Sequence, residues 1–192
     1  GTEEEESGEE GHEGHNHSHE LDPHVWLDPV LAQKEVTAIR DALIKKYPEK
    51  KAVFEKNTAA YLEKLTALDK EYQAAFAGAK NRTFVTQHAA FGYLAKQYDL
   101  TQEPIAGISP DQEPSPSRLA ELKKYIKTNN VSVIYFEASA STKVAKTLAD
   151  ETGVELAVLN PLESLTQKEQ EAGENYVSVM KENLAALQKS IH

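Results

Sequence analysis

Hydrophobic side chains in the first half of the chain recur every three to four positions, with charged residues between them. This period is typical of amphipathic helices. One such segment runs from Pro29 to Pro48, where Asp28 is placed to cap the helix and Pro29 fits its first turn. A second segment, from about 49 to 77, would span roughly 40 Å at 1.5 Å per residue, so we expect a strut that crosses the molecule. The apolar positions are Val36, Ile39, Leu43 and Ile44 in the first helix and Phe54, Tyr61, Leu65, Leu68, Tyr72 and Phe76 in the second.

From Arg82 onward, short apolar runs alternate with helical segments. The uninterrupted run 131–136 is typical of a buried strand in a parallel sheet, and we expect 154–159 to be another buried strand. The alternation predicts βαβ units whose sheet is covered on both faces. We expect a helix to begin at Ser115 and another near Ser141, and a capping box to link Thr166 with Glu169. The predicted strands are 83–86, 100–105 (the weaker one), 131–136 and 154–159, and the last helix is expected to turn Tyr176, Val177, Met180, Leu184 and Leu187 inward.

These patterns predict an α/β fold with a parallel sheet flanked by helices, a long helix and part of a second lobe. Residues 1–20 contain almost nothing apolar. Burial therefore cannot offset the entropy of ordering them, and we expect a disordered acidic, histidine-rich loop. Residues 21–48 hold a helix but no sheet, and we interpret them as the remnant of an N-terminal lobe. Residues 49–80 are the long linking helix, and 81–192 are the C-terminal α/β lobe.

Composition narrows the classes of partner. The chain has 192 residues, of which 40% are hydrophobic, and a net charge of −10. Nucleic acid and anionic membrane surfaces both attract basic patches, so neither is expected as the main partner. The absence of cysteine excludes disulfides and thiolate zinc sites. No run approaches the roughly 18 apolar residues of a membrane span.

Histidine is concentrated near the start of the chain. His12, His15, His17 and His19 lie in the acidic tract, and His24 follows it in a more apolar segment. Neutral imidazole is a common ligand of transition metals, so the tract predicts auxiliary metal capture next to a better-built site. The alternative is a solvated linker or an artificial tag. The interspersed Glu, Gly, Asn and Ser residues do not resemble a standard tag.

Three further candidates follow predicted strands. His88, Glu137 and Glu163 each come after the carboxyl end of a strand, the edge at which parallel sheets bind ligands. His24 is expected to reach this edge from the other lobe. Two imidazoles with a carboxylate make a credible zinc site.

Plainer interpretations of these residues stay open. His24 is then a loop histidine that packs on Trp26, His88 a histidine satisfied by backbone, and Glu163 a surface carboxylate. Glu137 fits a supporting or surface group better than a ligand. For Asp111 and Glu113, in the proline-rich loop, solvated charges are the default.

Five segments resemble blocks of a known family: DPHVWLDP, TQHAAFGYLAKQYDL, ISPDQEPSPSRLAEL, VIYFEASASTKVAKTLADETG and VLNPLESL. They are similar to the metal-binding lipoproteins of ABC importers, the cluster A-I solute-binding family, and within it to the zinc branch of AdcA/ZnuA-like proteins. The resemblance extends from Leu21 to the end of the chain. It implies two (β/α)4 lobes joined by one rigid helix, with the metal between the lobes.

The resemblance also implies a ligand set. Its second and third histidine ligands fall on His24 and His88, and its carboxylate falls on Glu163. A histidine at the third position resembles the zinc binders, since manganese and iron members usually carry a carboxylate there. The first-lobe histidine has no counterpart, so we expect the chain to be the C-terminal half of such a protein and to bind metal weakly unless complemented. Water or a tract histidine is a candidate for the vacant position.

The function implied is an extracytoplasmic receptor that passes Zn²⁺ to a membrane ABC permease, without catalysis. It is expected to be a monomer, lipid-anchored through an upstream cysteine. The alternatives are a manganese-binding member of the family, a surface adhesin and, least favoured, a zinc hydrolase. The hydrolase interpretation is weakened because the chain has no HExxH motif.

Overall fold

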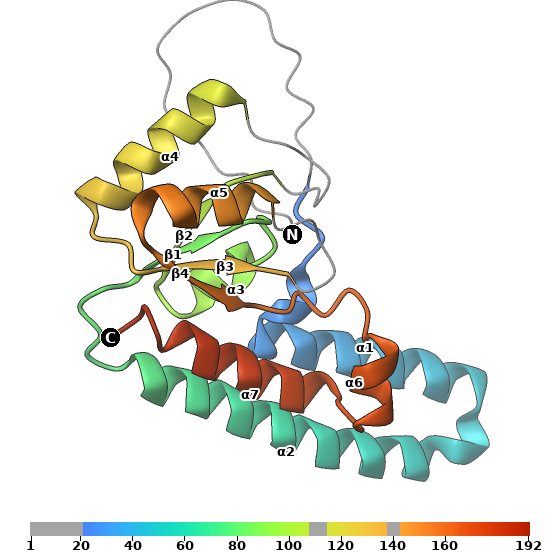
Figure 1. Ribbon diagram of the computed structural model, residues 1–192. Helices are drawn as coiled ribbons and strands as arrows, with labels where there is room; N and C mark the ends of the chain where they lie inside the picture. Colours follow the sequence, from blue (N-terminus) through green and yellow to red (C-terminus); the bar gives the residue numbers. More distant parts are fainter. Residues whose placement is uncertain (1–20, 108–114, 138–142) are drawn as a thin grey trace, which may run out of the picture.

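The computed structural model describes residues 21–107, 115–137 and 143–192. In these residues a small parallel sheet is sandwiched between helices, and a pair of longer helices extends to one side (Figure 1). The histidine tract, the loop with Asp111 and Glu113, and the predicted helix start near Ser141 lie outside the described residues. The elements are η1 Val25–Leu27, α1 Pro29–Lys46, η2 Pro48–Lys50, α2 Lys51–Phe76, β1 Thr83–Thr86, α3 Gly92–Gln97, β2 Thr101–Pro104, α4 Pro116–Thr128, β3 Val133–Phe136, α5 Lys143–Thr152, β4 Glu155–Val158, α6 Gln167–Glu171 and α7 Tyr176–Leu187.

The four strands form one sheet in the order β2-β1-β3-β4, and every neighbouring pair is parallel. The predicted parallel sheet is therefore confirmed. Thr86 of β1 is in register with Tyr135 of β3. The backbone N–H of Gln87 donates to the carbonyl of Tyr135 at 2.8 Å, which continues the pairing beyond the end of β1. The carboxyl ends of the strands consequently meet at one edge.

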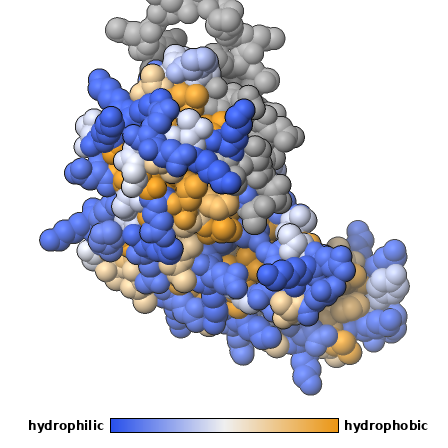
Figure 2. Space-filling view, in the orientation of Figure 1, coloured by the Kyte–Doolittle hydropathy of each residue, from blue (hydrophilic) through white to orange (hydrophobic). Residues whose placement is uncertain are grey.

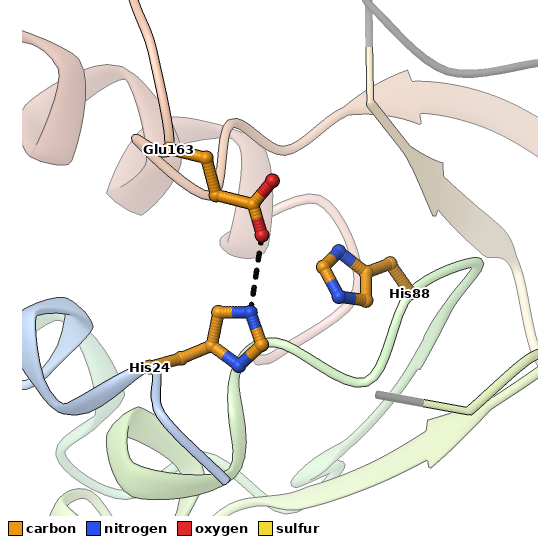
Figure 3. A group of neighbouring side chains, drawn as sticks. All are labelled: His24, His88 and Glu163. Carbon is orange, nitrogen blue, oxygen red and sulfur yellow. Dashed lines mark hydrogen bonds and ion pairs between the residues drawn. The ribbon is translucent and has the colours of Figure 1, made fainter. Parts of the chain in front are cut away.

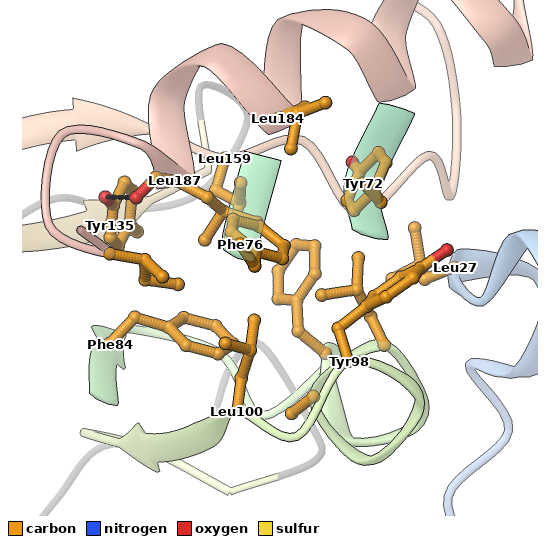
Figure 4. Close-up of a cluster of buried hydrophobic side chains, with 14 of the residues drawn as sticks. Leu27, Tyr72, Phe76, Phe84, Tyr98, Leu100, Tyr135, Leu159, Leu184 and Leu187 are labelled. Atoms are coloured by element: carbon orange, nitrogen blue, oxygen red, sulfur yellow. Dashed lines mark hydrogen bonds between the residues drawn. The ribbon is translucent and has the colours of Figure 1, made fainter. Parts of the chain in front are cut away.

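Alternate strand residues point to opposite faces of the sheet. Val85 and Ile134 face α4 and α5, where Leu122 and Leu148 complete one buried cluster. The other face carries the larger cluster, to which α2, α3 and α7 contribute (Figure 4). Both faces are covered, as predicted. The labelled members of the larger cluster are Leu27, Tyr72, Phe76, Phe84, Tyr98, Leu100, Tyr135, Leu159, Leu184 and Leu187.

The fourth strand differs from the prediction. Residues 154–159 were expected to be buried throughout, but Val158 is 45% exposed and Glu155 is exposed as well. The reason is the strand order: β4 lies at an edge of the sheet and pairs only with β3. A run of apolar residues in the sequence does not specify whether the strand that it forms lies in the centre or at the edge of the sheet.

The two predicted long helices are present, and α1 and α2 run side by side in opposite directions (Figure 1). Asp28 caps α1, because its Oδ1 accepts from the backbone N–H of Val30 at 2.7 Å. The 26 residues of α2 span about 39 Å, and its C-terminal half is buried against the sheet unit. The apolar face predicted for α1 is not buried: Ile39 and Leu43 are exposed, Ile39 at 60%, while Val36 and Ile44 are half-buried. Figure 2 accordingly shows hydrophobic surface among the hydrophilic residues of the helix pair. Only Pro29 and Ala32 of α1 are buried among the described residues, since its main helical neighbour is α2.

The end of the chain folds into two helices, α6 and α7, and the first of them begins where the sequence predicts. Thr166 and Glu169 form the expected capping box at α6. Gly153 directly follows the end of α5 with φ of +75°, in the left-handed backbone region that glycine adopts readily at the end of a helix. Met180, Leu184 and Leu187 of α7 are buried, while Tyr176 and Val177 are half-buried. Among the described helices, none is long and apolar enough to cross a membrane.

Candidate metal centre

The sheet topology brings the strand-end candidates together. His88 lies two residues after β1, Glu137 directly after β3, and Glu163 five residues after β4. His24 precedes η1 and comes to the same edge from the other end of the described chain. Figure 3 shows His24, His88 and Glu163 turned toward a common point. The expected edge site is thus present as a cluster of side chains.

The cluster has ligand-like dimensions. His24, His88 and Glu163 each offer one ligand atom, and these atoms all lie within 4.8 Å of one another. The two imidazole rings are each 2% exposed and meet edge to face, with centroids 4.9 Å apart. The Glu163 side chain is 40% exposed. The cluster therefore combines two buried imidazoles with one carboxylate that is partly exposed to solvent.

Both ring nitrogens of His24 face carboxylates. Its Nδ1 lies 2.7 Å from Asp22 Oδ1, and its Nε2 lies 3.1 Å from Glu163 Oε1. A neutral imidazole carries one proton and cannot donate to both. With Nδ1–H donated to Asp22, the Nε2 lone pair faces a carboxylate oxygen, and this contact is favourable only with a proton or a cation between them. Two ligands of a tetrahedral zinc ion lie about 3.3 Å apart, close to the distance observed here.

His88 has a carboxylate of its own. Its Nδ1 contacts Glu137 Oε1, and both side chains are buried. With Nδ1 engaged by Glu137, Nε2 is the ring nitrogen that can serve as a metal ligand. Glu137 is therefore not a surface group, and it lies outside the three-residue cluster.

The segment that carries His24 is fastened to the α/β unit. Trp26 Nε1 donates to the carbonyl of Pro161 at 2.9 Å, and the Tyr93 hydroxyl donates to the carbonyl of Asp22 at 2.9 Å. The Tyr176 hydroxyl donates to the carbonyl of Trp26. Burial raises the pKa of this hydroxyl, which keeps its proton available for the bond. Trp26 also packs beside the ring of His24, with centroids 5.3 Å apart.

The loop that carries Glu163 is held by a pair of asparagines. Asn183, buried on α7, accepts from the backbone N–H of Asn160 at 2.9 Å and donates to its carbonyl at 2.8 Å. The Asn160 side chain in turn accepts from the backbone N–H of Leu162, whose φ is +53°. The sequence analysis did not predict the supporting roles of Asn183 and Asp22. Only Asp22 could have been found from the sequence, because an aspartate two residues before a histidine can accept a hydrogen bond from the backbone N–H of that histidine. The structure shows this bond at 3.0 Å.

A parallel sheet that gathers two buried imidazoles and a carboxylate at its carboxyl edge defines an α/β protein with a candidate metal site. The chain belongs to the ZnuA family, described as the zinc-uptake complex component A, periplasmic, whose model matches residues 1–190. The family expected from the sequence blocks is thereby confirmed.

Named relatives and solved structures agree with this membership. The chain is 57% identical over 187 residues to the zinc-binding lipoprotein AdcA of Streptococcus pneumoniae, covering 97% of this chain and 37% of that protein. It is 55% identical over 174 residues to the high-affinity zinc uptake system protein ZnuA of Bacillus subtilis, covering 91% of this chain and 54% of that protein. The crystal structure of the Zn(II)-bound ZnuA-like domain of S. pneumoniae AdcA matches with a TM-score of 0.79 and 56% identity, over 91% of this chain and 66% of that one. The chain thus spans only part of the length of these relatives.

Proposed function

We propose that the chain contributes the greater part of the metal site of an extracytoplasmic receptor that delivers Zn²⁺ to an ABC permease. The observation that carries the proposal is the cluster of His24, His88 and Glu163, whose ligand atoms lie within 4.8 Å of one another. The zinc-related names of the relatives and the zinc-bound neighbour support the same conclusion.

The donor set favours zinc over manganese. Imidazole nitrogens suit zinc, whereas manganese prefers oxygen-rich sites. Two of the three clustered donors are imidazoles, and both are buried. Three protein donors leave a fourth tetrahedral position for a further ligand. A first-lobe histidine is the proposed occupant in the longer protein, with water or a tract histidine in its place otherwise.

The tract histidines have an auxiliary role in this proposal. His12, His15, His17 and His19 raise the local zinc concentration next to the built site and pass ions inward. His24 follows the tract after only four residues, so an ion captured there is close to the cluster.

The ion is cargo and not a catalyst. A zinc site with three protein ligands and an open position also resembles a hydrolase site, but membership of a zinc-uptake family favours a receptor. The names lipoprotein and periplasmic favour an extracytoplasmic location. We therefore propose a monomeric receptor, anchored through a lipid on an upstream cysteine, whose partner is the membrane permease.

The test is a competitive zinc titration of the purified chain against a chromophoric chelator. His88→Ala is expected to lower zinc affinity at least about 100-fold, because a buried ligand is lost. Joint replacement of the four tract histidines by alanine is expected to lower it less than about threefold, and Mn²⁺ is expected to compete weakly. Equal losses in the two variants would make the tract the main site, and tighter binding of Mn²⁺ would refute the metal assignment.

Transport requires a separate measurement. Growth of a strain that lacks the receptor gene should fail in zinc-depleted medium and recover with added zinc or with the wild-type gene. A His88→Ala gene should not restore growth. Normal growth of the deletion strain in depleted medium would contradict a primary role in zinc uptake.

A further inference from the structure

Glu137 faces His88 because of the sheet register. Thr86 of β1 is level with Tyr135 of β3, and the bond from Gln87 N–H to the Tyr135 carbonyl carries the pairing one step further. Two residues beyond this pair in each segment, the same register places His88 opposite Glu137. The contact between the two side chains is thus a consequence of how two central strands are aligned.

The surroundings of this pair are buried and largely apolar. Glu137 is 5% exposed and His88 is 2% exposed. His88 and Glu137 line a small pocket, and the other lining side chains include Phe91, Tyr135 and Leu159. A buried carboxylate needs a strong partner. Within the described residues, the hydrogen-bond partner of Glu137 is the Nδ1 atom of His88.

An acceptor at Nδ1 has three effects on a metal-binding histidine. It selects the tautomer with the proton on Nδ1, so that the lone pair is on Nε2. It prevents the ring from turning over, which would exchange a nitrogen for a carbon at the metal position. It also makes the ligand nitrogen more basic. Each effect acts through His88 and none requires Glu137 to touch the ion.

We propose that Glu137 is a positioning residue for metal capture: it holds His88 in the Nδ1-protonated tautomer, with Nε2 aimed at the site shared with His24 and Glu163. This inference rests on the proposed metal-binding function. A direct ligand role does not fit the geometry, because Glu137 lies on the Nδ1 side of the ring, while an ion bound at Nε2 lies on the other side.

The test uses two variants and one matched control. Glu137→Gln keeps an oxygen acceptor but removes the charge, and Glu137→Ala removes both. Glu103→Gln is the control, because Glu103 lies at the end of neighbouring β2 and pairs with Arg118 instead of a histidine. It changes the net charge by the same amount. Circular dichroism checks that each variant is folded.

Two measurements distinguish a role of Glu137 in positioning His88 from a purely structural role. In the zinc-free chain, long-range ¹H–¹⁵N correlation spectra report the tautomer of His88 directly. Chelator competition reports zinc affinity. We expect Glu137→Ala to give a mixture of tautomers and an affinity loss of about 10–100-fold. Glu137→Gln should keep the Nδ1-protonated tautomer with a smaller loss of at least about threefold, and the control should match the wild type.

The proposal is overturned if His88 keeps a single Nδ1-protonated tautomer in Glu137→Ala, or if that variant binds zinc within about twofold of the wild type. Should the alanine variant not fold, Glu137→Gln decides, and wild-type affinity in that variant would refute the proposal. The tautomer is measured without zinc, so its result stands even if the wild-type chain fails to bind the ion and the proposed function falls.

Discussion

Trp26 donates a hydrogen bond from its indole Nε1 to the carbonyl of Pro161 at 2.9 Å, across 135 residues of chain. Trp26 lies two residues after His24, and Pro161 lies two residues before Glu163. The bond therefore joins the segment that carries the candidate ligand His24 to the loop that carries the candidate ligand Glu163. It holds these two side chains near each other without an ion, which would lower the cost of organising the proposed site on binding.

Replacing Trp26 by phenylalanine should expose this coupling. Trp26→Phe keeps an aromatic ring beside His24 but removes the donor to Pro161. A lost hydrogen bond of about 1 kcal/mol corresponds to a zinc affinity about fivefold weaker, measured by chelator competition. Tyr125→Phe, a change of similar type on the α4 side of the sheet, serves as the control. An unchanged affinity in Trp26→Phe would mean that the loop is positioned without this bond.

Trp26 is also the only tryptophan of the chain, and it provides a direct signal of binding. Its ring centroid lies 5.3 Å from that of His24. Coordination of His24 changes the charge next to the indole, so its emission should change in a saturable way on addition of Zn²⁺. The change should vanish in His24→Ala and persist when the four tract histidines are replaced. A signal that survives in His24→Ala would show that zinc binds elsewhere.

The core elements were predictable because local pattern and tertiary environment agree in them. Thr83–Thr86 is a strand at the predicted residues, and the capping box of Thr166 and Glu169 starts a helix as expected. Prediction was wrong where burial depends on neighbours in space. The exposure of Val158 follows from strand order, and that of Ile39 from the lack of a covering element among the described residues. Neither is encoded in the local sequence.

The candidate site, like the fold, was predictable only in part from the sequence. The rule that parallel strands end at one edge was enough to bring His88 and Glu163 together, whereas His24 was only expected to reach that edge from outside the sheet until the family resemblance gave it a ligand position. The supporting groups were harder to predict. Asn183 and Asn160 are separated by 23 residues and meet only because α7 packs against the end of β4. A lone asparagine inside a helix gives no sign in the sequence that it holds a metal-site loop.

Asn183 should therefore matter for stability as well as for the site. Asn183→Ala removes two hydrogen bonds and leaves the backbone N–H and carbonyl of Asn160 without these partners. We expect a loss of about 2–4 kcal/mol in the free energy of unfolding, measured by urea denaturation. Asn129→Ala is the control, since the Asn129 side chain donates to a carbonyl in its own helix at an exposed position. Similar small losses in both variants would contradict a bracing role for Asn183.

The capping box predicts a pH dependence of stability with a definite sign. The backbone N–H of Thr166, and then its hydroxyl, donate to the Glu169 carboxylate and hold the pKa of Glu169 below its ordinary value of 4.5. Because the folded state favours the ionised form, this carboxylate adds stability above pH 4.5, and the contribution is lost as the pH falls through the lowered pKa. Solvent still screens the carboxylate because Glu169 is only partly buried, so the effect is small. Thermal unfolding of the wild type and of Glu169→Gln should therefore differ at pH 7, with the wild type more stable, and the difference should shrink steadily below pH 4.5. A difference that stays constant down to acid pH would show that the ionised carboxylate does not contribute to the cap.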